Sequence, residues 1–491
     1  MTLPTSGVLS LTDIQTEFGG SNPIGLNEYY AGGTYVPSGT TGTNGAVPTS
    51  GQISISNFYG TSSYYTLSKS LRFRNSASAY LNRTYGTPTN QKIWTFSAWV
   101  KRGLLGITNG GTSYALFGCD TSGDNPVGFV GTDCFTFQGI QSGVTSAYLV
   151  TNQVFQDTAA WYHIVIGYDS TQATASNRIK LYVNGTQITS FSSATYPAQN
   201  ANLPFNGASV AHSIGKYAPS GAWLFDGEMA NVYWIDGQAL TPSSFGATNS
   251  TFGGMWQPTA YTGTYGNNGC FLPFTNTTST STLGNDSSGN GNNWTTNNFS
   301  LTAGSTYDSL TDVPTLTSAT TANYCVLNQL LSGVVLQNGN LALGSSSGSY
   351  STSSTFYVNS GKWYWEVINL SSIGGGLGIT IAGASNTYLY NQPNCYGYYY
   401  NGQKRSQAGG NQSYGASYGA GDTIGIALDM DAGTITFYKN NVSQGIAYSG
   451  LSGYYCPATD TYPTGISFNF GQQPYIYTPP TGFLALNTYN L

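Results

Sequence analysis

Charge is what this sequence has least of. Only 7% of its 491 residues are charged, with 14 Lys and Arg against 19 Asp and Glu. A protein that binds duplex nucleic acid clusters its cations against the phosphates, whereas the cations here are dispersed along the chain. The composition therefore predicts no nucleic-acid partner. Solubility depends instead on Ser, Thr, Asn, Gln and Tyr, which is typical of a binding surface and equally of a chain built to last outside cells.

Long apolar runs, metal-binding motifs and a leader peptide are also missing. No apolar run approaches the ~20 residues that span a bilayer, and the first residues have neither a basic nor an apolar segment, so we expect no membrane insertion and no signal peptide. With no C-x-x-C motif and only two His, we expect no metal site and no cofactor. The six cysteines are expected to be reduced and semi-buried, with Cys119–Cys134 and Cys395–Cys456 as the alternative pairings within a domain.

Aromatic residues and turn formers are abundant, and they predict an all-β fold. Aromatics make up 14% of the chain and Gly accounts for 64 residues, with polar turns separating short apolar runs. The run from Ile179 to Ile188 alternates apolar and polar side chains around Asn184-Gly185, as in a hairpin with a primed turn. A second such hairpin is centred on Asn440-Asn441. Two hairpins about a domain apart indicate two separate antiparallel β-sandwiches.

Residues 1–62 contain an internal duplication. The stretch P-T-S-G-V-L-S-L at residues 4–11 recurs as P-T-S-G-Q-I-S-I at residues 48–55, and each copy continues to an aromatic-Gly pair. Each copy predicts a turn, a short strand and one or two helical turns, so the module is α+β. Because so few apolar side chains bury little alone, we expect these residues to dock onto other proteins. The alternative is a small appendage packed on the next domain.

Residues 63–250 carry a different set of motifs. They are S-L-R-F-R-N-S-A at 70–77, W-T-F-S-A-W-V-K-R-G at 94–103, L-Y-V-N-G at 181–185 and F-D-G-E-M-A-N-V-Y-W at 225–234. In order and spacing they resemble concanavalin A-like (laminin-G-like) jelly rolls, most closely those of bacteriophage virion proteins such as tail-fibre-like proteins of marine phages. The resemblance implies two curved antiparallel sheets. It also implies that Asp120 and Asp124 can hold Ca²⁺, although plain turns use the same residues.

The jelly-roll fold also hosts glycanases, so the carboxylates decide between binding and catalysis. Glycoside hydrolysis needs two carboxyl groups that face each other across the scissile bond. The glucanase pattern E-x-D-x-x-E is absent, and the chain has only four Glu. Asp226 and Glu228 lie two residues apart, but a turn Asp and a strand-surface Glu fit this spacing better. His163 is expected to be a satisfied core His, so we predict no catalytic residue.

Residues 251–320 are predicted to connect the two sandwiches and to pack against them. They are rich in Gly, Asn, Thr and Ser, yet aromatic residues are spaced through them, which a flexible linker would lack. Residues 271–274 predict an edge strand. Asp286 lies among Asn and Gly residues, which favours a tight turn over a cation site.

Residues 321–491 contain a third set of strand motifs. They are G-K-W-Y-W-E-V at 361–367, G-D-T-I-G-I-A-L-D at 421–429, G-T-I-T-F-Y-K-N at 433–440 and F-N-F-G-Q at 468–472. Together they resemble a SPRY (B30.2-like) domain, which implies a β-sandwich that binds partners through loops at one edge and is not an enzyme. Its tyrosine-rich insertion suits stacking on a ligand, although half of the rings would equally pack inward. The candidate ligand-binding residues are Tyr396, Tyr398, Tyr399, Tyr400, Tyr414 and Tyr418.

These features together predict a phage virion structural protein that acts by binding, as a tail fibre or tail-associated adhesin. We expect residues 1–62 to contact other tail or capsid proteins and the sandwiches to reach a host-surface glycan or protein. Fibres assemble as symmetric oligomers, so we expect a homotrimer in virions assembled in the host cytoplasm. Two alternatives stay open: a capsid-bound decoration or head-fibre protein without a receptor role, and a glycan-degrading tailspike enzyme.

Overall fold

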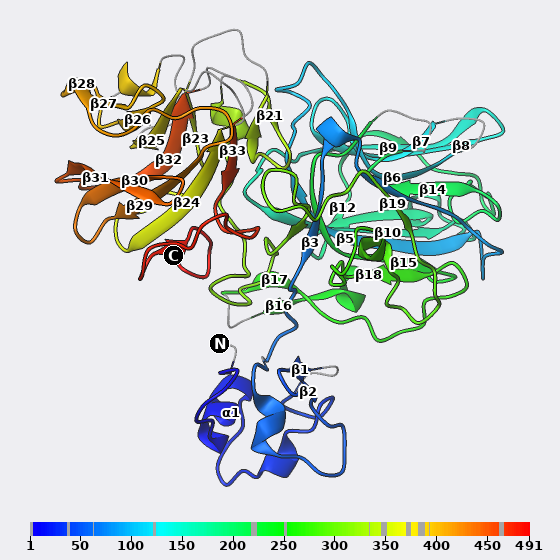
Figure 1. The fold of residues 1–491 in the computed structure, drawn as a ribbon. Coiled ribbons are helices and arrows are strands. Elements are labelled where there is room, and N and C mark those ends of the chain that lie inside the picture. Colours follow the sequence, from blue (N-terminus) through cyan, green and yellow to red (C-terminus); the bar gives the residue numbers. More distant parts are fainter. Residues whose placement is uncertain are drawn as a thin grey trace.

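The structure, a computed structural model, places nearly all regular elements in antiparallel sheets, so the predicted all-β fold is confirmed. It describes residues 3–36, 40–61, 63–120, 124–217, 223–249, 253–332, 334–344, 351–369, 375–381, 388–391, 393–460 and 466–491. A small N-terminal module lies beneath two β-sandwiches that are placed side by side (Figure 1). Among these residues no helix is both long and apolar enough to cross a membrane.

The N-terminal module has a core of its own, to which both copies of the duplicated motif contribute. Its elements are α1 (Leu11–Phe18), η1 (Leu26–Glu28), β1 (Thr41–Gly42), β2 (Gly45–Ala46) and η2 (Ile55–Phe58). Both copies start their helix with the same cap: the backbone N–H of Ser10 donates to Asp13, and that of Ser54 to Asn57. The short strands predicted before these caps do not form, because the described backbone there passes directly into the helical turn.

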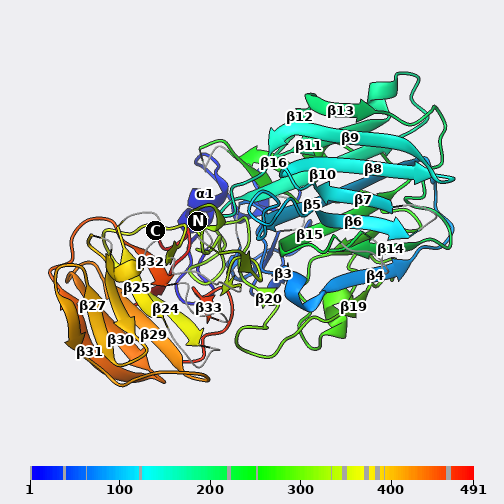
Figure 2. The same cartoon turned by 90° about the horizontal axis from the view of Figure 1, so that it is seen from above.

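The first sandwich packs two eight-stranded antiparallel sheets face to face (Figure 2). One sheet has the order β12-β11-β10-β5-β15-β3-β20, with β18 also paired to β15, and the other has the order β13-β9-β8-β7-β6-β14-β4-β19. The strands are β3 (Ser70–Phe73), β4 (Tyr80–Thr84), β5 (Ile93–Arg102), β6 (Tyr114–Asp120), β7 (Asp124–Phe129), β8 (Cys134–Gln141), β9 (Val144–Val154), β10 (Trp161–Asp169), β11 (Ile179–Val183), β12 (Thr186–Ile188), β13 (Phe191–Thr195), β14 (Ala211–Ile214), β15 (Gly227–Asp236), β18 (Cys270–Leu272), β19 (Thr295–Asn297) and β20 (Ser309–Leu310).

Aromatic rings fill the space between these two sheets. Trp94 stacks on Trp234 and Tyr168 with ring centroids 4.7 and 5.1 Å apart. The predicted hairpin joins β11 to β12, with positive φ at both Asn184 and Gly185, as a primed turn requires. The alternation seen in the sequence therefore set both the register and the buried face.

The connecting segment belongs structurally to the first sandwich. Its strands β18, β19 and β20 extend both sheets, and Phe271 stacks on Tyr233 at 4.4 Å. A ribbon of β16 (Gly246–Asn249) and β17 (Met255–Pro258) precedes them. The outer face of the β5–β15 sheet is thus covered by chain that follows it in sequence.

The second sandwich has the strand motifs in the predicted order. Its sheets run β21-β22-β33-β24-β29-β30-β31, with β34 also paired to β24, and β23-β32-β25-β26-β27-β28. The strands are β21 (Leu336–Gln337), β22 (Ala342–Leu343), β23 (Ser351–Ser353), β24 (Lys362–Asn369), β25 (Gly376–Thr380), β26 (Tyr396–Tyr399), β27 (Gln403–Ser406), β28 (Gly410–Ser413), β29 (Thr423–Asp429), β30 (Thr434–Lys439), β31 (Val442–Ser449), β32 (Cys456–Asp460), β33 (Ile466–Asn469) and β34 (Leu484–Ala485). Asn440 and Asn441 make the second hairpin turn with positive φ.

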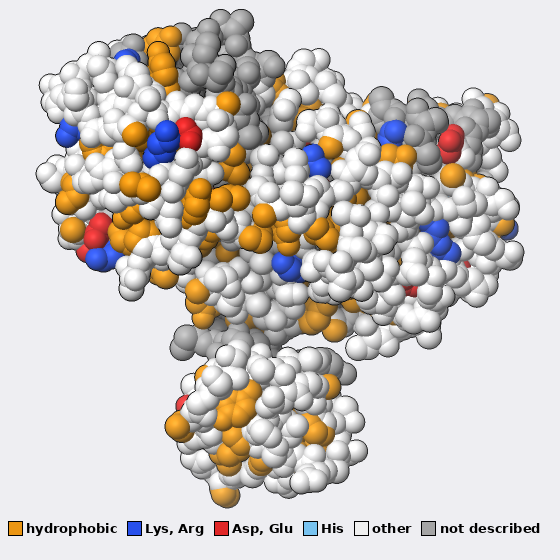
Figure 3. Space-filling model, viewed as in Figure 1, with side chains coloured by type: hydrophobic (Ala, Val, Ile, Leu, Met, Phe, Trp, Pro, Cys, Tyr) orange, Lys and Arg blue, Asp and Glu red, His pale blue; other side chains and the backbone are white. Residues whose placement is uncertain are grey.

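Five buried charged residues meet where the first sandwich contacts the segment that leads to the second. Arg72, Glu228 and Lys101 stand opposite one another on β3, β15 and β5, on the covered face of the sheet. Asp308 and Asp312 from the connecting segment contact this row, and each has a fully buried side chain. We call these five residues the junction cluster. Much of the remaining surface is uncharged, as the visible face in Figure 3 shows.

Asp308 of the junction cluster pairs with two arginines, Arg72 within the cluster and Arg74 beside it. Its carboxylate lies 3.2 Å from Nε of Arg72 and 2.7 Å from Nε of Arg74, and the Ser300 N–H also donates to it. Arg72 further donates to the carbonyl oxygens of Ser305 and Tyr307. Removing one partner of a buried ion pair leaves a charge that water cannot reach, which is the costly step.

We therefore expect Asp308→Ala to lower the free energy of unfolding by about 3–5 kcal/mol, because two buried guanidinium groups lose their counter-charge. Asp157 caps an exposed turn by accepting from the Ala159 N–H, so Asp157→Ala serves as the control and costs less than about 1 kcal/mol. Denaturant unfolding of both variants measures the difference. Equal losses would contradict the assigned role of the junction cluster.

Candidate binding site

Asp226 and Glu228 are buried, not a turn Asp and a surface Glu as predicted. Both residues are 1% exposed. Glu228 lies on the sheet face that Asp312 of the connecting segment covers, whereas Asp226 lies beneath residues 338–339. Asp226 accepts from the backbone N–H groups of Asn338 and Gly339, which fastens the start of the second sandwich to the first. Glu228 accepts from the Ser70 hydroxyl at 3.1 Å. Burial raises the pKa of both carboxyl groups.

Two further buried carboxylates, Asp236 and Glu366, also bind backbone N–H groups. Asp236, at the far end of β15, accepts from the N–H groups of Thr89, Asn90 and Asn268. Glu366 on β24 accepts from two N–H groups of the C-terminal segment, at 2.8 Å each. These carboxylates are occupied by structural donors, so they offer no free pair across a cleft.

Both histidines are neutral and structural. Burial lowers the pKa of each to about 3. The Nε1–H of Trp256 donates to Nδ1 of His163 at 2.9 Å, which leaves Nε2 of His163 to carry the proton and face the Ser97 hydroxyl, also at 2.9 Å. His212 stacks on Tyr85 with centroids 3.8 Å apart. The prediction that His163 is a satisfied core residue therefore agrees with its surroundings. Its side chain lies on the outer face of the sheet, which later segments of the chain cover.

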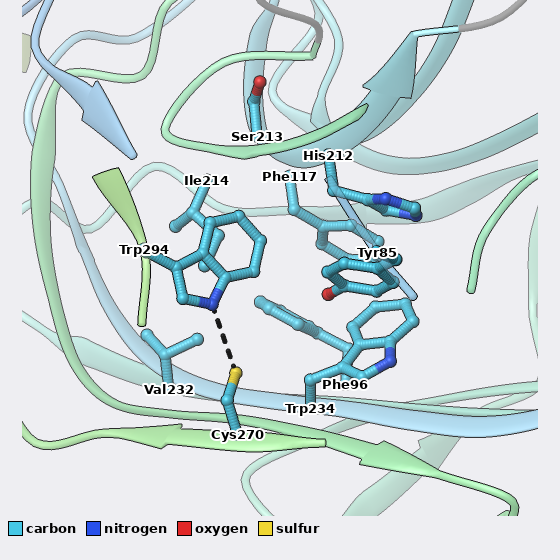
Figure 4. A pocket seen from close by; sticks show the side chains of 10 residues that line it. All are labelled: Tyr85, Phe96, Phe117, His212, Ser213, Ile214, Val232, Trp234, Cys270 and Trp294. Carbon is cyan, nitrogen blue, oxygen red and sulfur yellow. Dashed lines mark hydrogen bonds between the residues drawn. The ribbon is translucent and has the colours of Figure 1, made fainter. Parts of the chain in front are cut away.

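An apolar cavity lies between the two sheets of the first sandwich (Figure 4). Its volume is about 10 Å³, which is room for a single water. Tyr85, Trp234 and Trp294 line it, and the Trp294 Nε1–H donates to the Cys270 sulfur at 3.3 Å. The cavity is a packing gap of the core and cannot admit a ligand.

No disulfide links the six cysteines, all of which lie within the described residues; five are buried and Cys134 is half-buried. The described chain holds no group of three or more His, Cys, Asp or Glu placed to bind a metal. Of the Ca²⁺ loop at Asp120 and Asp124, residues 121–123 lie outside the described part. Asp286 accepts from the N–H groups of Phe271, Ser288 and Asn292, so it closes a turn.

The candidate tyrosines gather on β26 and the loops beside it, but most of their rings point into the sandwich. Tyr398, Tyr399 and Tyr418 are 0%, 3% and 6% exposed, and rings that deep cannot stack on a ligand. Tyr396 and Tyr414 are half-buried, and their rings face Tyr448 and Tyr398 at 4.9 and 5.2 Å. Tyr400, at 40% exposure, is the candidate ring that the fold presents to solvent.

A buried acid that the sequence did not reveal lies beneath these rings. Asp460, at the end of β32, accepts from the backbone N–H groups of Gly376 and Leu389. Burial raises its pKa to about 6, although these hydrogen bonds oppose the shift. The Arg405 guanidinium lies over the Tyr399 ring, 4.6 Å from its centroid, and closes the site from outside.

A hollow of about 490 Å³ opens on the first sandwich beside the β16–β17 ribbon. Tyr64 and Tyr65 line one side of it, and Asn249, Gln257 and several Thr and Ala residues line the rest. The hydroxyls of both tyrosines already have partners, Leu316 O and the Asn231 amide, which fix the ring positions. Fixed rings beside amide and hydroxyl groups suit an uncharged polar ligand.

Two segments match known families. Residues 73–244 match the family described as the concanavalin A-like lectin/glucanases superfamily, and residues 362–473 match the SPRY domain. The chain therefore carries one concanavalin A-like domain and one SPRY domain, in the order that the motifs predicted.

Curated relatives match over short segments. They are the E3 ubiquitin-protein ligase RKP of Arabidopsis thaliana (37% identity, 15% of this chain and 6% of the relative), the dual specificity protein kinase splA of Dictyostelium discoideum (33%, 25% and 5%) and Ran-binding protein 10 of Danio rerio (29%, 21% and 18%). The chain thus spans less than a fifth of these relatives. The solved SPRY domain of human HERC1 matches with 20% identity and a TM-score of 0.24, over 28% of this chain and 89% of that one.

The raised pKa of Asp460 predicts a pH dependence of stability. The pKa of Asp460 is about 6 in the folded protein against the usual 3.8. Protonated Asp460 therefore contributes to the free energy of unfolding fully below pH 3.8, and this contribution is lost as the pH rises through 6. We expect Asp460→Asn to raise the free energy of unfolding at pH 7 by about 2–3 kcal/mol, with no gain below pH 4.

Asp429, paired with Lys362 at 2.8 Å, is the control of opposite sign, because its pKa is lowered. Asp429→Asn should lose stability at pH 7 and recover relative to wild type on acidification. Unfolding curves at several pH values measure both variants, and a pH-independent effect of Asp460→Asn would refute the assignment.

Proposed function

We propose that this protein works by binding and not by catalysis, as a structural protein of a bacteriophage virion that attaches to the host surface. One observation carries the binding role: the buried acids and both histidines are used to hold the fold, while much of the visible surface is polar and uncharged. Such a surface forms many weak contacts of hydrogen-bonding and stacking type. The resemblance of its motifs to virion proteins supports the phage setting.

Each part has a role in this proposal. The N-terminal module, with its own core, docks onto other tail or capsid proteins. The two sandwiches project from it as one unit, because Asp226 and the junction cluster connect them. A homotrimer would present three copies of each surface and multiply weak contacts with a glycan or protein on the host. The name of one relative, Ran-binding protein 10, fits a binding role for the SPRY domain.

Tyr400 offers the sharpest test of a ligand surface at the tyrosine-rich strand. We expect Tyr400→Ala to weaken adhesion of the purified protein to host cells by about tenfold, since one exposed stacking ring contributes about 1–1.5 kcal/mol and several copies act together. Tyr489, 42% exposed, is the matched control, and Tyr489→Ala should leave adhesion unchanged. Flow cytometry with labelled protein measures both.

Adhesion that survives Tyr400→Ala would remove this ring from the binding surface and point to the 490 Å³ hollow instead. Release of reducing sugars from the host envelope would overturn the binding role itself. Antibody labelling of intact particles, read by electron microscopy, distinguishes a tail position from a capsid position.

A further inference from the structure

Lys101 is the lysine of the junction cluster, and its ammonium group is buried among three hydrogen-bond acceptors. Its Nζ lies 2.6 Å from Oδ2 of Asp312 and 2.8 Å from Oδ1 of Asn323, and it also donates to the Tyr324 carbonyl oxygen. The side chains of Lys101 and Asp312 are 2% and 0% exposed. An amine within hydrogen-bond distance of an amide oxygen is held close to the amide carbon, which it must reach from above the amide plane for nucleophilic attack.

The amide of Asn323 is held in one orientation. Its Nδ2 donates to the Ala159 carbonyl oxygen at 2.9 Å, so Oδ1 must face the lysine. Asn323 itself is only half-buried, which leaves a route to solvent for a small leaving group. The amide is thus held in one orientation beside the amine, and released ammonia can reach solvent.

Asp312 is positioned as a proton acceptor. The Trp161 Nε1–H and the Tyr324 N–H both donate to its Oδ1, at 3.0 and 3.2 Å, which directs Oδ2 toward Lys101. Trp99, Trp161 and Val313 form an apolar wall beside it. Burial raises the pKa of Asp312, so its carboxyl group can hold a proton taken from the amine.

Glu228 adds a second carboxyl group to the same site. It stands opposite Lys101 across the β5–β15 ladder, and within the described chain its buried Oε1 accepts no hydrogen bond. Glu228 also stands opposite Arg72, so it faces both cations of the row, while Asp312 is the carboxyl group that contacts the Lys101 amine.

We propose that Lys101 and Asn323 join spontaneously in an isopeptide bond, with release of ammonia. Asp312 takes one proton from the Lys101 ammonium group, and the free Nζ pair forms a bond to Cγ of Asn323 while the carbonyl electrons move to Oδ1. The intermediate collapses as Oδ1 re-forms the double bond and the Cγ–Nδ2 bond breaks. Asp312 gives its proton to Nδ2, so that ammonia leaves, and then takes the second proton that Nζ must lose to become an amide N–H. That proton passes to the departing ammonia, so the net products are the isopeptide bond and one ammonium ion.

The bond would fasten β5 of the concanavalin A-like domain to the segment that enters the SPRY domain. It would close a covalent loop across 222 residues, which contains most of the concanavalin A-like domain and restricts the unfolded chain. This role is independent of what the surface binds, so its test does not depend on the proposed adhesion.

Intact mass of the denatured full-length protein tests the proposal directly. We expect a mass lower than that of the sequence by one ammonia, and a tryptic map in which the Lys101 and Asn323 peptides are joined. Succinimide formation at an Asn-Gly pair such as Asn184-Gly185 gives the same loss, and the joined peptide distinguishes the two. A folded wild-type protein with the full sequence mass after prolonged incubation would overturn the proposal.

Variants identify the groups involved. Lys101→Met and Asn323→Ala should each have their full sequence mass and migrate more slowly than wild type on a denaturing gel, since they lack the covalent loop. Lys362→Met, which removes a surface lysine paired with Asp429, is the control and should keep the ammonia loss. An ammonia loss that persists in Lys101→Met would refute the assignment even if that variant is unstable.

Discussion

The whole molecule depends on a row of opposite charges buried on one face of a sheet. Arg72, Glu228 and Lys101 project from β3, β15 and β5 into a space from which water is excluded. Buried charges destabilise the fold unless they are paired with opposite charges. The partners of Arg72 and Lys101 are Asp308 and Asp312, which follow them by more than 200 residues in the chain. The need to pair them therefore fixes where the connecting segment lies, and with it where the second sandwich starts.

The fold could be predicted from the sequence because its strongest signals are local. Alternation around Asn184-Gly185 and Asn440-Asn441 determines which residues face inward, and the turn chemistry sets the register. The short strands predicted at the start of the two N-terminal copies do not form, because the local pattern on which the prediction rested could not show whether a partner strand was present. A strand needs a neighbour, and nothing in a local pattern shows whether one is present.

The candidate site was harder to predict, because alternation identifies a buried face only when the other face is wet. Both faces of β15 are covered, so the sequence could not show that Glu228 is buried. Tyr398 and Tyr400 look alike in sequence, yet one is in the core and the other is exposed. Asp460 and Asn323 gave no signal, since their partners are brought together only by the tertiary fold.

The late arrival of the connecting segment has a consequence for synthesis on the ribosome. Until residues 308–312 emerge, the cations of β3 and β5 lie on an open sheet face that is still in water. Charged side chains on an uncovered face discourage nascent sheets from joining one another, as inward-pointing charges do on edge strands. The same groups that later lock the domains would thus protect the half-made chain from aggregation.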